Sequence, residues 1–241
     1  MESASIASFG RMGKGGKVCR IMSLLDELIE GWTEKCLPPL LPKETRVFWQ
    51  RNRQTAYIDN SWGPAIPYPS VDHGDGTANY GYVSLKGNAA ACKRVPEVQD
   101  WPEFSNFLTI INSIESPLET VGCEKAFFDR PDGVATVSLG TYVDVIFSDP
   151  KVTEDPQAYL HLAARIFVAT KECDNWWGTV ELGFQRLRHL DGASKPWGLM
   201  MKVLNAGRDR DEARKYWGES IRRIGAELAV LPRGFPRVSG A

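Results

Sequence analysis

The sequence has few of the residues on which catalytic and metal sites are usually built. It contains three histidines in 241 residues, and its five cysteines are odd in number, widely spaced and without a Cys-x-x-Cys pair. It also lacks zinc-ligand spacings, a Gly-x-Ser-x-Gly elbow, a dinucleotide-binding fingerprint and an RNA-binding aromatic platform. The sequence therefore predicts that the protein is not an enzyme, binds no metal and needs no cofactor.

Long apolar runs are missing as well. No stretch approaches the roughly 18 consecutive apolar residues of a membrane-spanning helix, and the first residues lack the apolar core of a secretory signal. Scattered cysteines without a pairing pattern are typical of a reducing compartment. We therefore expect a cytoplasmic protein with reduced thiols and no contact with a membrane.

Charge is distributed unevenly along the chain, although the net charge is only −1. Residues 1–20 carry +3 and residues 201–241 carry +4, whereas residues 21–200 hold sixteen Lys/Arg against twenty-four Asp/Glu, a net charge of −8. Because phosphate binding needs clustered cations, we expect no direct contact with nucleic acid. An acidic body can be steered toward a basic protein, or it can simply keep the protein in solution.

Apolar residues at three- and four-residue steps predict four amphipathic helices. They are expected to start at Ser23, to cover Trp101–Ile114, to start at Pro156 behind an Asp155 cap, and to cover Asp211–Leu228. Residues 1–20 are rich in Gly, Ser and Lys and predict a disordered tail. We expect residues 21–238 to form a single domain.

Alternating apolar residues predict several strands between these helices. The segments are RVFWQRN, TAYIDNSW, a hairpin of EKAFF and VATVSLGTYVDVIF around DRPDG, and a strand containing GTVELGF, while LMMKVL is a short apolar element and 63–81 a long loop. Regular βαβ alternation is missing. The pattern therefore predicts an α+β fold whose mainly antiparallel sheet is covered by helices on one side.

The strand that follows the adjacent pair Trp176 and Trp177 suggests a division between its two faces. Trp176 shares one face with Val180, Leu182 and Phe184, and Trp177 shares the other face with Glu181, because side chains alternate along a strand. We expect the first face to pack under helices. Trp177, Glu181, the neighbouring Asp174, and Asp144 on the second face of the hairpin then become the candidate partner-binding residues. In the alternative, another helix covers this face and buries both rings.

Two groupings are compatible with catalysis. His73 lies between Asp72 and Asp75 and could hold a hard cation, but the glycines around it favour a turn. His189 could activate Cys173, yet nothing in the sequence indicates a cationic pocket that would lower the pKa of this thiol.

The PDG hairpin with its long second strand, the helix after EDP and the strand NWWGTVELGF together resemble the bacterial toxin-immunity proteins, particularly the Immunity protein 52 family. The resemblance runs from about Ser23 to Leu228. It implies an α+β protein that binds and neutralises a cognate toxin in the producing cell, a DNase effector of a type VI secretion system. It transfers no toxin-contacting residue, so the four candidates depend on strand facing alone. A small metal-dependent hydrolase and a scaffold that forms homo-oligomers through an uncovered sheet face remain as alternatives.

Overall fold

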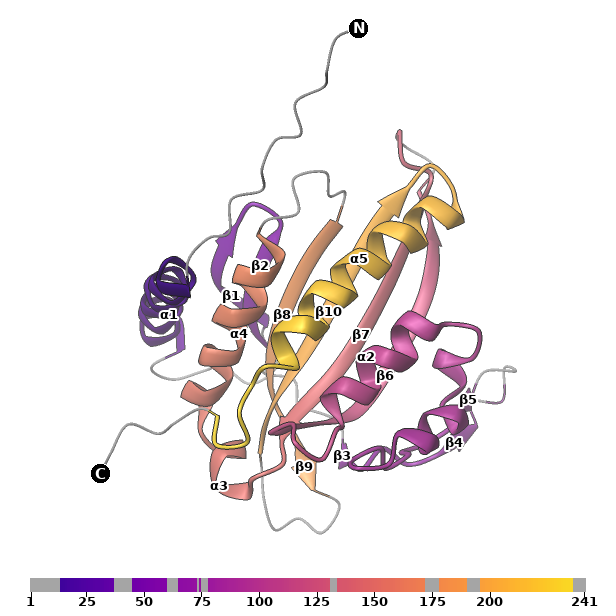
Figure 1. Ribbon diagram of the computed structural model, residues 1–241, viewed down its shortest axis with the longest axis horizontal. Helices are drawn as coiled ribbons and strands as arrows, with labels where there is room; N and C mark the ends of the chain where they lie inside the picture. Colours follow the sequence, from indigo (N-terminus) through magenta and orange to yellow (C-terminus); the bar gives the residue numbers. More distant parts are fainter. Residues whose placement is uncertain are drawn as a thin grey trace, which may run out of the picture.

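The centre of the computed structural model is a six-stranded sheet (Figure 1). The structure describes residues 14–36, 45–59, 65–72, 74, 78–130, 134–171, 178–189 and 196–235. The strand order is β1-β2-β8-β10-β7-β6, and neighbouring strands run antiparallel except for the parallel pair β2 and β8. The strands are β1 (Thr45–Arg51), β2 (Gln54–Asp59), β6 (Leu118–Asp129), β7 (Val137–Phe147), β8 (Gly178–Arg186) and β10 (Trp197–Gly207).

Helices cover one face of this sheet, as Figure 1 shows. They are α1 (Lys14–Cys36), α2 (Pro102–Ile111), α4 (Pro156–Thr170) and α5 (Arg210–Leu228). The predicted α+β fold, with a mainly antiparallel sheet covered on one side, is therefore confirmed. Among the described residues, no helix has both the length and the apolar character needed to cross a membrane.

Short elements lie around one end of the sheet. Two-residue strands pair as β3 (Ala65–Ile66) with β9 (Arg188–His189), and as β4 (Val71–Asp72) with β5 (Ala78–Asn79). The short 3-10 helices η1 (Ala89–Arg94) and η2 (Pro96–Val98) precede α2, and the one-turn helix α3 (Pro150–Thr153) precedes α4. The described part of the loop predicted over 63–81 thus contains three short strands.

Aromatic side chains make up much of the core between helices and sheet. The ring of Trp32 in α1 lies 5.3–5.4 Å from those of Phe48, Phe184 and Trp197, which come from three strands. Trp217 in α5 is fully buried, and its indole donates a 3.0 Å hydrogen bond to the hydroxyl of Thr141. Such ring pairs stabilise beyond their buried area by about 0.5–1.5 kcal/mol each.

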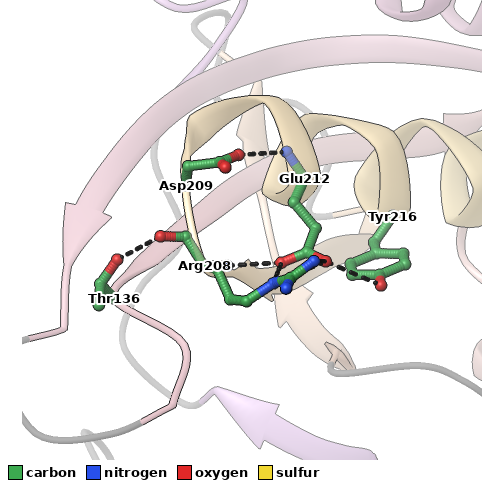
Figure 2. A network of polar contacts seen from close by, with 5 residues as sticks. All are labelled: Thr136, Arg208, Asp209, Glu212 and Tyr216. Atoms are coloured by element: carbon green, nitrogen blue, oxygen red, sulfur yellow. Dashed lines mark hydrogen bonds and ion pairs between the residues drawn. The ribbon is translucent and has the colours of Figure 1, made fainter.

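Helices α4 and α5, like the short α3, begin where an aspartate side chain accepts a hydrogen bond from one of the first backbone amides. Asp155 accepts a 2.9 Å hydrogen bond from the amide of Gln157 at the start of α4, which confirms the predicted cap. Figure 2 shows the start of α5, where Asp209 accepts from the amide of Glu212, and the Glu212 carboxylate accepts in turn from the amide and side chain of Arg208. These hydrogen bonds from Arg208 lower the pKa of Glu212 to about 2.

The first helix differs from its prediction. It begins at Lys14 rather than at Ser23, so residues 14–20, which were expected in the tail, belong to the helix, whereas residues 1–13 lie outside the described residues. Lys17 forms an ion pair with Glu227 near the end of α5, and Arg165 of α4 donates a 2.8 Å hydrogen bond to the same carboxylate. The sequence near Lys14 does not predict this start of the helix, because the contact joins residues that are 210 positions apart and the glycines that follow Lys14 have a poor intrinsic helix propensity.

The segment LMMKVL belongs to a longer strand than its sequence indicates. Strand β10 covers eleven residues and lies between β7 and β8. A central strand is covered on both sides for part of its length, so its apolar residues do not alternate cleanly. Gly198, Asn205 and Gly207 further weaken the strand signal at its two ends.

The face of the sheet opposite the helices, called here the open face, is covered only in part. Over one half, Ile66 and Leu187 pack with Val121 and Ile146 in a small second core, with Tyr68 against it. A Cβ atom at Gly122 would overlap the ring of Tyr68, so a glycine is required where this ring lies on β6. The other half of the open face carries the candidate functional site.

Candidate functional site

Strand register aligns four polar side chains across the open face. Glu181 of β8 pairs with Lys202 of β10, Lys202 with Tyr142 of β7, and Tyr142 with Glu124 of β6. All four project from the same side because directly opposed residues share a face. This row marks the border between the covered and the exposed half of the open face.

An apolar hollow of about 290 Å³ adjoins this row. Ala126, Phe128, Gly140 and Leu204 contribute its apolar lining. A Cβ atom at Gly140 would lie 2.9 Å from Phe128 and 3.1 Å from Leu204, so the glycine lets both side chains close over the strand. Phe128 is 52% exposed, although a phenyl ring of this size is usually buried. We define this hollow, with Glu124, Tyr142, Glu181 and Lys202, as the hollow surface.

The charges of the hollow surface are mainly negative. Among the described residues, the carboxylates of Glu124 and Glu181 take part in no ion pair or side-chain hydrogen bond. Lys202 lies over the ring of Tyr57, with its ammonium nitrogen 5.7 Å from the ring centroid. Lys125 also lines the hollow, but its ammonium nitrogen lies 4.0 Å from the centroid of the Trp101 ring, on the side of the sheet that the helices cover. Two carboxylates and one ammonium group therefore project from the open face, which suits a cationic partner.

Asp144 does not belong to this exposed surface. Its side chain is only 3% exposed, and it accepts hydrogen bonds from the Tyr68 hydroxyl at 2.7 Å and from the Gln185 amide at 3.0 Å. Burial raises the pKa of Asp144 to about 6, although both hydrogen bonds and Lys202 oppose this rise. The expected exposure of Asp144 is therefore wrong, because Tyr68 from a distant loop covers the carboxylate.

The structure tests the predicted faces of the strand after the tryptophan pair only in part. Val180, Leu182 and Phe184 are fully buried under the helices, and Glu181 lies half-buried on the open face, as their alternation predicts. Trp176, Trp177 and Asp174 lie outside the described residues. The division of the two indoles between opposite faces therefore stays a prediction.

The structure describes only some of the residues considered for catalysis. His73, Asp75 and Cys173 lie outside the described residues, and Asp72 accepts a 2.9 Å hydrogen bond from the amide of Gly74, as a turn former does. The third histidine of the sequence, His161 in α4, packs edge-on against Phe235, and burial lowers its pKa. Within the part of the chain that the structure describes, no three His, Cys, Asp or Glu side chains come together as a metal site.

Phe128, Tyr142, Lys202 and Leu204 were not among the predicted site residues. The hairpin holds a signal for the first two, because β6 and β7 pair Phe128 with Ser138 and Glu124 with Tyr142 on the second face. Lys202 and Leu204 have no such signal in the sequence, because the apolar run LMMKVL does not alternate and so does not indicate which face of a strand each side chain occupies.

No protein-family model, curated protein or solved structure matches this chain. The resemblance to toxin-immunity proteins therefore stays a prediction, and the geometry of the hollow surface is the observation that bears on function.

Proposed function

We propose that the protein is a stoichiometric inhibitor that binds a basic protein on the hollow surface, and that this partner is a toxin. The supporting observation is an apolar hollow containing a half-exposed Phe128 and bordered by carboxylates without ion pairs among the described residues. An aromatic anchor inside a polar rim is the usual composition of a protein-binding hot spot. Inhibition by binding needs no turnover and no cofactor.

Electrostatics favours a cationic partner over other classes. Residues 21–200 carry a net charge of −8, and the hollow surface has the same sign. Complementary potentials raise the rate of encounter and fix orientation. A nuclease must present a cationic surface to DNA, so a DNase effector of a type VI secretion system, as the family resemblance implies, has the required charge.

The size of the hollow surface sets the expected energy. A specific interface of standard size buries about 1,600 Å² in total, so the hollow would form only the centre of a larger contact. Truncation of one central aromatic residue typically costs about 2–4 kcal/mol, which is roughly 30-fold or more in affinity. Phe128 is the residue that we expect to contribute most.

Co-expression with the product of the neighbouring gene, scored as rescue of growth, tests this proposal. The intact chain should restore growth, Phe128→Asp should not, and Val230→Asp should behave as the intact chain. Val230 is a suitable control because it is 66% exposed and directly follows α5, the helix on the covered face of the sheet. Unfolding midpoints of both variants would show that they are folded.

Three outcomes would contradict the proposal. Growth rescue that survives Phe128→Asp would place binding elsewhere. Affinity that does not change with salt concentration would exclude attraction between the carboxylates and a basic partner, since exposed charges are screened over about 8–10 Å at ordinary ionic strength. Light scattering that grows with protein concentration, and that Phe128→Asp abolishes, would make the hollow surface a contact between copies of this chain.

A further inference from the structure

A second cavity, of about 560 Å³, adjoins the hollow surface and shares Glu124 and Tyr142 with it. It lies between β6 and the segments before and after β5, where the chain continues into η1 and η2. Tyrosines 68, 80, 82 and 142 contribute to its lining. Volumes of roughly 300–1,000 Å³ are typical of cavities that bind small ligands, so this one can receive a long side chain. We call it the tyrosine cavity.

The lining of the tyrosine cavity is held in place by hydrogen bonds. The Tyr68 hydroxyl donates to the buried carboxylate of Asp144 at 2.7 Å, and the amide of Tyr82 donates to the carbonyl of Tyr68 at 3.0 Å. Gly81 has a φ of +79° and lies against Ser70, which fixes the chain between Tyr80 and Tyr82. A lining fixed in advance reduces the entropy that is lost when a ligand binds.

The charges around the tyrosine cavity favour a cation. Glu97 and Glu124 line it together with one cation, Arg94, whose side chain is exposed. Asp144 lies behind Tyr68 and adds to the negative potential. Burial raises the pKa of the Tyr142 hydroxyl, and the carboxylates of Asp144, Glu124 and Glu97 raise it further.

We propose that the tyrosine cavity receives the guanidinium group of an arginine side chain from the bound partner. The inference rests on the proposed function, because the partner supplies this side chain. A guanidinium is planar and weakly hydrated, so it stacks on tyrosine rings, and it can donate to Glu97 and Glu124. The two carboxylates disfavour an anion, and an uncharged donor could form hydrogen bonds with them but would not neutralise their charge.

A small probe tests the cavity without the partner. N-acetyl-arginine amide is titrated into the full chain and followed by NMR of the tyrosine side chains, in parallel with N-acetyl-citrulline amide, which has nearly the same shape but no charge. We expect the arginine probe to bind at least about fivefold more tightly, since only its guanidinium adds attraction between opposite charges to the hydrogen bonds that both probes can donate. Equal binding of the two probes would overturn the inference.

Matched variants separate the tyrosine cavity from the hollow surface. Glu97 lines only the former, whereas Glu219 is exposed on α5. Glu97→Gln should weaken the arginine probe about fivefold to tenfold, and Glu219→Gln should not change it. Equal effects of the two variants would refute the cavity assignment.

The same variants separate failure of this inference from failure of the proposed function. If the arginine probe does not bind but Phe128→Asp still abolishes growth rescue, the tyrosine cavity is not an arginine site and the proposed function stands. If the probe binds at Glu97 but Phe128→Asp keeps full rescue, the partner does not bind on the hollow surface, and that part of the proposed function fails while the tyrosine cavity remains an arginine site.

Discussion

Asp144 gives the clearest prediction, because a buried carboxylate links stability to pH. Burial raises its pKa from 3.8 to about 6 in the folded protein, whereas the unfolded chain exposes this group to water. Between these two values the folded state holds a proton that the unfolded state has lost. The contribution of Asp144 to stability is therefore fully present below about pH 4, and it is lost as the pH rises through 6.

The magnitude follows from the difference between the two pKa values. One pKa unit corresponds to about 1.4 kcal/mol, and at pH 4 the unfolded chain has already lost about half of this proton, so the ionised Asp144 makes the folded protein roughly 2.5 kcal/mol less stable at pH 7.5 than at pH 4. Asp144→Asn stays neutral throughout. Its amide can still accept from Tyr68, and it can donate to Gln185 if that amide turns over.

Urea unfolding of the wild type and of Asp144→Asn from pH 4 to pH 8 measures this effect. We expect the free energy of unfolding of the wild type to fall by roughly 2.5 kcal/mol relative to the variant across this interval. Because the Tyr68 hydrogen bond lowers the pKa of Asp144, Tyr68→Phe should move the fall to higher pH. A difference between wild type and Asp144→Asn that is constant, or that grows in favour of the wild type with pH, would refute the reasoning.

Three further changes test the packing on both faces of the sheet, each by urea unfolding. Gly122→Ala should displace the ring of Tyr68 and destabilise the protein by about 1–3 kcal/mol, and an unchanged midpoint would contradict the close contact. Glu227→Ala should lower the free energy of unfolding by about 2–3 kcal/mol, because it leaves the partly buried Arg165 without its carboxylate. A decrease of less than about 1 kcal/mol, which is typical of an exposed ion pair, would contradict a stabilising role for this contact. Trp217→Phe should cost about 2 kcal/mol through lost volume and a lost hydrogen bond, so a neutral result would contradict the packing of α5.

The sequence predicts the regular parts of the fold well. Asp155 and Pro156 mark the start of α4, and the alternation around the PDG turn identifies the hairpin of β6 and β7, because both signals arise from neighbouring residues. The side of Glu181 on β8 follows from the same alternation. Local periodicity is enough for these features.

The remaining features depend on contacts between residues that are distant in the sequence. Alternation places Asp144 on the second face of β7, but only the position of Tyr68, 76 residues earlier, determines that this carboxylate is buried. The start of α1 likewise involves Lys17 and Glu227, which are 210 residues apart. The hollow surface needs the register of β7 against β10, and Lys202 and Leu204 enter it only through that pairing.

The most direct test of the account is hydroxyl-radical footprinting of the chain with and without the neighbouring gene's product. If the hollow surface binds the partner, Phe128 and Tyr142 should become protected while Val230 keeps its reactivity, since the first two lie on the open face and Val230 follows α5. Unchanged reactivity of Phe128 and Tyr142 in a complex that protects the outer faces of α2 and α5 would contradict it.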